Sequence, residues 1–364
     1  MTGSEDLLLS VLRDALWGRA EVEIPPEVYK EAEAQRVLGL IEQKAPYQQL
    51  ATFVQYIYDQ EEVIRLFSDA GIPMAIIKGT AAAIYYPQPY RRSMGDYDLI
   101  VPPACFTAAW DLLEENGYKT KARRTESTPR EVAFYKEDSE YELHYRFSDY
   151  SIDIDRFVEA GLQNLETGGI DEHQFPMLPK LANGLVLLSH ISHHLHLGLG
   201  LRQIIDWMMY CDKVLDDAFW EDEFKRAADE VGLTALAITA TALCQKYLGL
   251  RASILWCRKA DETLVDQLME TVMTSGNFGG KQGRGNKIQT TVTNFKREGF
   301  FRYLQHAGEC NWRAYHRHTW LKPVCWIYQI FRYIKQGAGR GRKLKEDIAQ
   351  GNQRFELLER LGID

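Results

Sequence analysis

The sequence predicts an α+β protein, with a small mixed β-sheet embedded in a larger helical body. Apolar residues recur at helical spacing over the first 70 residues and again from about residue 156. Between residues 71 and 150 the spacing changes to short apolar runs and alternating stretches, which are typical of strands. We therefore divide the chain into an N-terminal helical region (1–70), an α/β core (71–155), a helical domain (156–275) and a basic, aromatic-rich helical region (276–364).

The composition is that of a globular protein with an ample core, since 45% of the 364 residues are hydrophobic and 26% are charged. The six cysteines are scattered without a CxxC pair, which argues against a disulfide framework or a structural zinc site. The first ten residues lack the basic-then-apolar pattern of a secretory signal, and the apolar runs are too short to cross a bilayer. We therefore expect a cytoplasmic protein that does not insert into membranes.

The net charge of −8 is unevenly distributed along the chain. Residues 281–345 hold 15 Lys and Arg but only two acids, Glu298 and Glu309, so the rest of the chain is strongly acidic. An acidic body argues against a general nucleic-acid coat protein. The basic section is suited to guiding a phosphate-rich ligand or partner onto one face.

The elements of the core follow from their apolar patterns. The stretch "YQQLATFVQYIYDQEEVIRLFSDAG" predicts a helix that stops at Gly71. The runs "IPMAIIKG" and "DYDLIVP" predict short strands, and residues 103–117 predict an amphipathic helix. "EVAFYKED" and "YELHYRF" alternate as the two strands of a hairpin around the polar residues 137–140.

The second half of the chain predicts mainly helices, interrupted by the Gly-rich basic stretch "SGNFGGKQGRGNK" (275–287). A P-loop interpretation of this stretch fails, because Lys281 is followed by Gln282 and position 275 is serine. We expect a mobile loop, with a lid over phosphates as the alternative. Further on, "WIYQIFRYIK" (326–335) predicts an amphipathic helix whose Trp, Ile and Phe side packs inward. Stacking on exposed bases or lying on a membrane surface are its alternatives.

The candidate site begins with two alternating aspartates, Asp96 and Asp98, in the predicted strand "DYDLIVP". Residues two apart on a strand face the same way, so the two carboxylates repel each other unless a positive charge lies between them. A divalent cation suits such oxygen ligands, Mg²⁺ above all and Mn²⁺ as the alternative. Glu142, which shares one strand face with His144, is the candidate third carboxylate.

A phosphate-binding turn precedes these aspartates. Gly79 and Thr80 open the predicted helix "TAAAIYY", whose free N–H groups favour phosphate oxygens. Gly79 lets the backbone approach a ligand closely, and Thr80 is able to cap the helix and offer a hydroxyl. Lys78 and Arg92 supply charge for a triphosphate or a pyrophosphate leaving group, and Gly95 allows a close approach beside Asp96.

Taken together, this pattern resembles the nucleotidyltransferase superfamily of the DNA polymerase β type. The fuller string "KGTA…YPQPYRRSMGDYDLIV…YELHYRF" is similar to the bacterial "uncharacterised nucleotidyltransferase" family within it. The resemblance implies that Gly79 and Thr80 cradle the triphosphate of an NTP, and that Asp96 and Asp98 bind two metal ions. It also implies that Glu142 helps to position the acceptor or acts as the base. The implied activity is transfer of a nucleoside monophosphate with release of pyrophosphate.

Several other residues have competing interpretations. Asp153 and Asp155 repeat the alternating pattern, but without an upstream glycine turn they rank second as a metal site. His190 and His194 lie four apart on a predicted helix; we expect partly buried histidines, with a helix lining the cleft or a zinc site as alternatives. Arg202 and Asp206, also four apart, predict an ion pair on the helix surface, or a buttress of the site.

The acceptor remains open at this level. The acidic body suits a cationic small molecule, whereas the basic section suits an RNA end, as in a tRNA-directed or toxin-like transferase. A protein acceptor is a third alternative. A catalytically silent nucleotide-binding scaffold is the alternative from another class, and the intact carboxylates speak against it.

Overall fold

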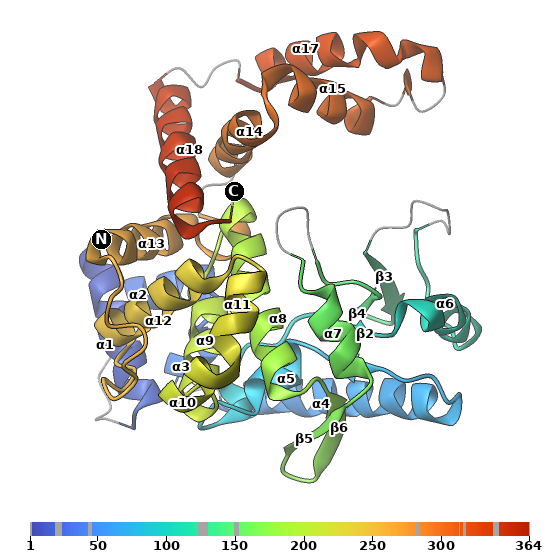
Figure 1. Cartoon of the computed structure of the whole chain (residues 1–364), viewed down its shortest axis with the longest axis vertical. Coiled ribbons are helices and arrows are strands. Elements are labelled where there is room, and N and C mark those ends of the chain that lie inside the picture. Colours follow the sequence, from blue (N-terminus) through green and yellow to red (C-terminus); the bar gives the residue numbers. More distant parts are fainter. Residues whose placement is uncertain are drawn as a thin grey trace.

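The computed structural model describes residues 2–18, 24–42, 46–122, 130–148, 153–281, 284–312, 314–315, 318–337 and 342–363. Within these residues the chain forms one six-stranded sheet and many helices, an α+β arrangement that confirms the predicted fold class (Figure 1). None of the helices described combines the length and the apolar run that crossing a membrane requires.

The strands are β1 (Ala75–Ile76), β2 (Tyr97–Ile100), β3 (Glu131–Lys136), β4 (Ser139–His144), β5 (Glu166–Ile170) and β6 (His173–Met177). They form one mixed sheet in the order β3-β4-β2-β1-β6-β5. β2 is parallel to β4 and β1 is parallel to β6, while the other neighbouring pairs are antiparallel. The predicted hairpin is confirmed as β3 and β4, which turn at residues 137–138.

The helices fall into three stretches of the chain. The first half holds α1 (Gly3–Leu16), α2 (Pro26–Ala34), α3 (Leu38–Ile41), α4 (Pro46–Asp69), α5 (Gly79–Ala83), η1 (Pro89–Arg91), η2 (Pro103–Cys105), α6 (Phe106–Glu115) and α7 (Asp155–Leu162). The middle holds α8 (Lys180–Leu197), α9 (Leu201–Lys213), α10 (Asp217–Phe219), η3 (Trp220–Phe224), α11 (Lys225–Glu230), α12 (Thr234–Leu248) and α13 (Glu262–Ser275). The last stretch holds η4 (Asn277–Gly279), α14 (Arg284–Glu298), α15 (Phe300–Asn311), η5 (Thr319–Val324), α17 (Cys325–Gly337) and α18 (Arg342–Leu361).

The two faces of the sheet belong to different hydrophobic cores. On one face, Tyr97 of β2 and Tyr141 of β4 are buried and stack with ring centroids 4.5 Å apart. Tyr56 of α4 extends this stack at 4.1 Å from Tyr97, so α4 covers this face. On the other face, the side chains of Ala75 and Ile100 pack into the core of the helical body. Alternation along β2 therefore points Asp98 away from α4 and toward the helical body.

The predicted region 1–70 does not behave as one unit. Its helices α1, α2 and α3 contribute buried residues to the core of the helical body, whereas α4 packs under the sheet. The sheet also extends past residue 155, because β6 pairs with β1 and β5 pairs with β6 as the outer strand. This hairpin escaped prediction because "ETGGI" and "HQFPM" contain glycine and proline, which are poor strand formers.

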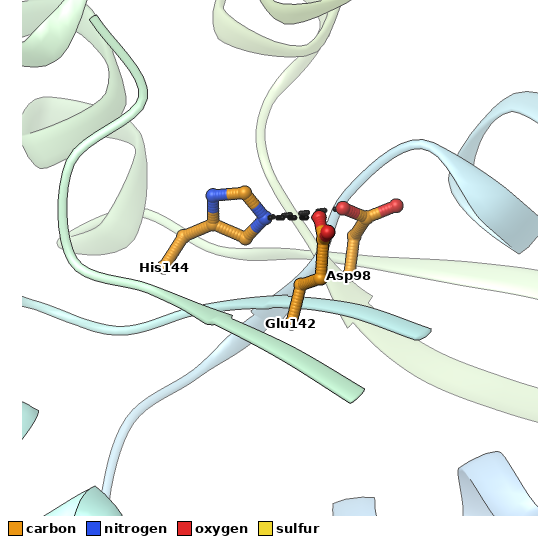
Figure 2. A group of neighbouring side chains, drawn as sticks. All are labelled: Asp98, Glu142 and His144. Atoms are coloured by element: carbon orange, nitrogen blue, oxygen red, sulfur yellow. Dashed lines mark hydrogen bonds and ion pairs between the residues drawn. The ribbon is translucent and has the colours of Figure 1, made fainter. Parts of the chain in front are cut away.

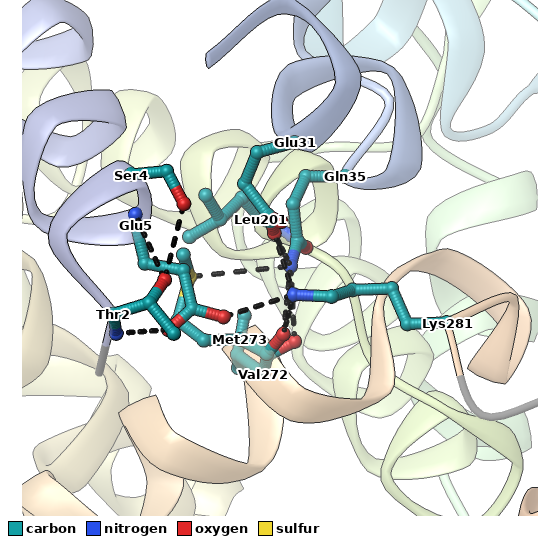
Figure 3. A network of polar contacts seen from close by, with 9 residues as sticks. All are labelled: Thr2, Ser4, Glu5, Glu31, Gln35, Leu201, Val272, Met273 and Lys281. Atoms are coloured by element: carbon teal, nitrogen blue, oxygen red, sulfur yellow. Dashed lines mark hydrogen bonds and ion pairs between the residues drawn. The ribbon is translucent and has the colours of Figure 1, made fainter. Parts of the chain in front are cut away.

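The stretch expected to be a mobile loop (275–287) is anchored at its middle, at Lys281. The Lys281 ammonium contacts Glu5 Oε1 at 2.9 Å, Glu31 Oε1 at 2.8 Å and the carbonyl oxygen of Met273 at 2.6 Å (Figure 3). Gln35 adds a second link, because its amide donates to Val272 O and accepts from the backbone N–H of Leu201. Lys281 therefore ties α1 and α2 to the end of α13, so it is no lid residue. Gln282 and Gly283 of the same stretch lie outside the described residues.

The prediction that α17 packs its apolar side inward is wrong. Phe331 is 65% exposed and Ile334 is 64% exposed, while Cys325 and Gln329 are the buried residues of this helix. α17 packs against α15 as the outer helix of a pair (Figure 1). A helix with one partner buries only one stripe, and here that stripe is not the most apolar one.

We expect the Lys281→Met substitution to lower the free energy of unfolding by about 1–3 kcal/mol, because it leaves two mostly buried carboxylates without their cation. Lys225→Met is the matched control, since Lys225 pairs with Asp229 on an exposed helix face. We expect the control to cost less than about 0.5 kcal/mol. Chemical denaturation of both variants measures this, and equal losses would contradict an anchoring role for Lys281.

Candidate active site

A cavity of about 260 Å³ lies between strands β2 and β4 and helices α8 and α9. Eleven of the fifteen site candidates taken from the sequence line it, and Thr80, Asp153, Asp155 and Asp206 do not. The lining consists of Lys78, Gly79, Arg92, Gly95, Asp96, Asp98, Arg130, Glu131, Glu142, His144, Phe147, Ser189, His190, His193, His194, Leu197 and Arg202.

Asp98 and Glu142 are brought together by the parallel pairing of β2 with β4. They occupy the same register position on neighbouring strands, so their side chains lie next to each other on the cavity face. Lys78 lies between them, with its Nζ 2.5 Å from Asp98 Oδ1 and 3.9 Å from Glu142 Oε2. Asp98 is 3% exposed and Glu142 is 23% exposed, so solvent screens this contact weakly.

His144 completes the group from two positions further along β4. Its Nε2 lies 3.1 Å from Asp98 Oδ1 and 3.4 Å from Glu142 Oε2, as Figure 2 shows. Its Nδ1 lies 3.3 Å from Glu131 Oε2 on β3, the residue paired with His144 across the hairpin. The imidazole therefore links three carboxylates from three adjacent strands.

The pKa directions follow from these contacts. Burial alone would raise the pKa of Asp98, but the Lys78 ammonium and the His144 ring hold it well below its ordinary value. Burial raises the pKa of Glu142 and exceeds the opposing effects of His144 and Lys78. Burial would lower the pKa values of Lys78 and His144, yet their carboxylate partners raise both. Asp98 is thus the permanently ionised member, and Glu142 is the one closer to taking up a proton.

The donor atoms of Asp98, Glu142 and His144 fit one cation. One atom from each of these residues lies within 4.8 Å of the others, and no second group of this kind occurs among the residues that the structure describes. Two carboxylates and an imidazole are ordinary ligands for a divalent ion. The set differs from the predicted Asp96, Asp98 and Glu142 by exchanging one aspartate for His144.

Asp96 lies one residue before β2 and lines the same cavity, outside the group of three. The charge of Asp98 and then burial raise the pKa of Asp96, while Lys78 and Arg202 oppose that rise. The carbonyl oxygen of Asp96 accepts a hydrogen bond of 3.0 Å from the Tyr56 hydroxyl, which fixes the backbone here. The charge of Asp98 therefore affects the Asp96 carboxylate, although Asp96 does not belong to the group of Asp98, Glu142 and His144.

The turn before α5 has an unusual backbone. Lys78 adopts φ +55° and ψ −126°, a conformation that residues other than glycine rarely take, and Gly79 has φ +24°. A Cβ at Gly79 would lie 2.5 Å from the Tyr56 hydroxyl, so only glycine fits here. Such strain is typical of functional sites, and here it directs Lys78 toward the carboxylates.

Thr80 does not have the predicted role. Residue 78 is the N-cap of α5, without a side-chain cap hydrogen bond, and the helix has only five residues. The Thr80 hydroxyl is fully buried and donates to Gln60 Oε1 at 2.8 Å. Gln60 in turn contacts His173, so Thr80 belongs to the packing between α4 and β6.

Arg92 and Asp206 form a buried bidentate pair. Arg92 Nε and Nη2 donate to the two oxygens of Asp206 at 2.7 and 2.8 Å, and the Tyr86 hydroxyl donates to Asp206 Oδ1 at 2.6 Å. The predicted surface pair between Arg202 and Asp206 is therefore wrong, since Asp206 is 2% exposed. Because its guanidinium is engaged by Asp206, Arg92 positions the segment before Asp96 while it also lines the cavity.

Arg202 lines the cavity instead. Its Nη1 donates to the carbonyl oxygen of Ser93 at 3.3 Å, and a Cβ at Gly95 would make only an ordinary contact of 3.7 Å with it. Burial lowers the pKa of Arg202, assisted by the nearby charge of Arg92. Gly95 thus leaves room between this guanidinium and Asp96.

His190 and His194 lie on α8 across the cavity, with their Nε2 atoms 2.9 Å apart. Burial lowers the pKa of His190 well below the ordinary value and that of His194 to about 3. The nearby charges of Lys78 and Arg202 lower both pKa values further. Among the described residues they belong to no group of three metal-ligating side chains, which leaves the zinc interpretation without support. The alternative of a helix lining the cleft agrees with their position.

Asp153 and Asp155, the second-ranked metal site of the sequence analysis, stabilise a loop. Asp155 Oδ1 accepts from the backbone N–H groups of Phe147 and Ser148 at 2.7 and 2.9 Å, and Asp153 Oδ1 accepts from the Ser148 hydroxyl. Neither lines the cavity.

Glu131 and His190 are the site residues that sequence reasoning undervalued. Only the hairpin register, which pairs Glu131 with His144, could have indicated the first of them.

A scan against known protein families matches residues 27–249 to the family described as "Uncharacterised nucleotidyltransferase". This match spans more than half of the chain and includes β1 to β6, the cavity, and helices α4 to α12. A search of curated proteins found no match.

We expect His194 to make stability depend on pH. Its pKa of about 3 in the fold lies below the ordinary histidine value, so only the unfolded chain takes up this proton as the pH falls below about 6.5. Stability then falls by about 2 kcal/mol between pH ~7.5 and pH ~5 from this residue alone. Denaturant unfolding at both pH values measures it. In the His194→Asn variant, the fall in the free energy of unfolding between the two pH values should be smaller by about this amount. A fall equal to that of the wild type would contradict the assignment of this effect to His194.

Proposed function

Because the chain belongs to the family of uncharacterised nucleotidyltransferases, we propose that it transfers a nucleoside monophosphate from an NTP to an acceptor nucleophile and releases pyrophosphate. The observation that carries the proposal is the adjacency of Asp98 and Glu142 on parallel strands, with Lys78 reaching both from the glycine turn. Carboxylates and a lysine in one cavity suit the binding of metal-bound phosphates.

The residues that would hold a divalent cation are Asp98, Glu142 and His144, with Asp96 beside them for a second ion. When bound, such ions stabilise the charge of the phosphates and of the in-line displacement. Mg²⁺ is the proposed ion. The His144 imidazole favours Mn²⁺ as the alternative ion, because nitrogen ligands are less suited to Mg²⁺. Metal binding requires neutral His144, so we expect metal affinity to fall as the pH falls.

The remaining steps fall to side chains of this cavity. The acceptor oxygen attacks the α-phosphorus, the bond from that phosphorus to the bridging oxygen breaks, and pyrophosphate leaves with the electron pair. The acceptor's proton passes to an Oε atom of Glu142, whose raised pKa suits a general base. Lys78 and Arg202 are the cavity cations available to the departing pyrophosphate, with Arg202 taking the role first expected of Arg92.

For the acceptor, a small molecule is the proposal, with Asp96 and Glu131 as the cavity carboxylates that a cationic group could contact. The acceptor class is open to direct measurement. Incubating the protein with each α-labelled NTP and a cell extract shows where the label goes, and label in RNA or protein rather than in small molecules would contradict the proposal.

The Asp98→Asn variant should lower kcat/KM at least about 100-fold, because it removes the permanently ionised ligand. Asp153→Asn is the matched control, since Asp153 is an exposed loop residue outside the cavity. We expect near-normal activity from this control. The assay measures pyrophosphate release with Mg²⁺ and with Mn²⁺, and chelation of the metal should abolish it. Normal turnover by Asp98→Asn would sink the proposed mechanism.

Calorimetry separates an enzyme from a silent scaffold. We expect NTP with Mg²⁺ to bind the wild-type protein and to bind the Asp98→Ala variant at least about tenfold more weakly. Equal binding by the two proteins, together with no turnover, would favour a scaffold that holds nucleotide by other contacts.

A further inference from the structure

The helix pair formed by α15, η5 and α17 (residues 300–337), here called the α15–α17 hairpin, carries an exposed apolar surface that the proposed function does not use. Figure 1 shows it at the top of the view, away from the sheet. Its described residues include an unusual number of exposed large apolar side chains: Phe300 (50%), Phe301 (69%), Trp320 (75%), Val324 (38%), Ile327 (37%), Phe331 (65%) and Ile334 (64%).

The packing of the hairpin fixes these side chains outward. Gly308 of α15 lies against the backbone of Cys325, where a Cβ would come within 2.2 Å of the Cys325 carbonyl oxygen. Trp312 stacks on Tyr328, with ring centroids 5.1 Å apart. These contacts use one side of α17. Ile327, Phe331 and Ile334 recur at four- and three-residue spacing, so they share the opposite side.

The charge of the hairpin is strongly positive. Residues 300–337 contain six Lys and Arg and a single acid, Glu309. Glu309 lies 3.7 Å from Lys322, so its own charge is offset locally. Lys335 follows Phe331 by four residues, so it flanks the exposed apolar side of α17 and is itself exposed, and Arg302 is exposed beside Phe301 on α15. Apolar aromatic and aliphatic side chains with flanking basic residues are the features of a helix that lies in a lipid interface.

We propose that the α15–α17 hairpin binds the surface of a membrane rich in anionic lipids. Phe331, Ile334 and Ile327 enter the headgroup boundary, and the basic side chains contact the lipid headgroups. The attachment is parallel to the membrane plane, and no helix needs to cross the bilayer.

Two other occupants are less compatible with these residues. Single-stranded RNA binds by stacking bases on aromatic rings, and the branched aliphatic side chains Ile327 and Ile334 offer no ring. A second copy of this chain would bring two hairpins of the same positive charge together, which opposes association. An anionic lipid surface matches both the aliphatic content and the charge.

The chain offers a matched control on α4. Leu50, Val54 and Tyr58 form another exposed apolar stripe, at 41%, 57% and 66% exposure. α4 carries four acids and one base, so a stripe of three exposed apolar side chains, like the one on α17, occurs there with the opposite charge. Lipid binding driven by apolar exposure alone would involve both stripes. Binding by the proposed surface involves the hairpin only.

The test is vesicle co-sedimentation of the full chain with phosphatidylcholine vesicles, with and without about one-third phosphatidylserine. We expect binding to the anionic vesicles only, weakened by salt. Phe331→Ser/Ile334→Ser should weaken it at least about tenfold, because two interface side chains are lost. Arg302→Gln/Lys335→Gln should remove the preference for anionic vesicles, since both side chains are exposed. The control, Val54→Ser/Tyr58→Ser, should bind as the wild type does.

Several results would overturn the proposal. Absence of wild-type binding to anionic vesicles is the first, and an equal loss in the α4 control is the second. The third is a dimer seen by light scattering that Phe331→Ser/Ile334→Ser dissociates, and the fourth is single-stranded RNA binding lost in that variant while vesicle binding persists. The substituted side chains are exposed, so circular dichroism should show these variants folded. Pyrophosphate release is a separate readout that the hairpin variants should leave unchanged.

Discussion

The contact of Lys78 with the neighbouring carboxylates Asp98 and Glu142 is the interaction on which the rest of the site depends. Two acids side by side on parallel strands, mostly shielded from water, require a positive charge close by. The chain supplies that charge from a strained turn before α5 and from His144 on the same strand as Glu142. This arrangement keeps Asp98 ionised, and the same electrostatic demand suits a divalent cation and the phosphates that accompany it.

The fold serves this contact by giving the two faces of the sheet different partners. One face is closed by α4 through the stacked rings of Tyr56, Tyr97 and Tyr141, which fixes the register of β2 and β4. The opposite face enters the helical body, so the acids lie where the two cores meet. The buried pair of Arg92 and Asp206 then links α9 to the segment before Asp96. The site is thus positioned by both cores, which explains why the N-terminal helices are divided between them.

Much of this could be predicted from local patterns. Alternation placed Asp98 and Glu142 on strands, the polar residues 137–140 indicated the β3–β4 hairpin, and the family match agrees with the motif of glycine turn and alternating acids. The errors share a cause. Arg92, Thr80 and the apolar side of α17 were interpreted from residue type and spacing, yet their partners lie far away in the sequence. Asp206, Gln60 and the limited surface of α15 decided their roles.

The amino-acid sequence by itself determined the fold class, the acids that we propose as the site and the family to which they point, because these depend on residue types at short spacing. Only the tertiary structure decided which of those acids form the tight group, since the pairing of β2 with β4 sets that distance across 44 residues. It likewise paired Arg92 with the distant Asp206, placed Arg202 beside Arg92 at the cavity, and turned Phe331 and Ile334 outward. Contacts between distant segments are fixed by packing and burial, which no local pattern records.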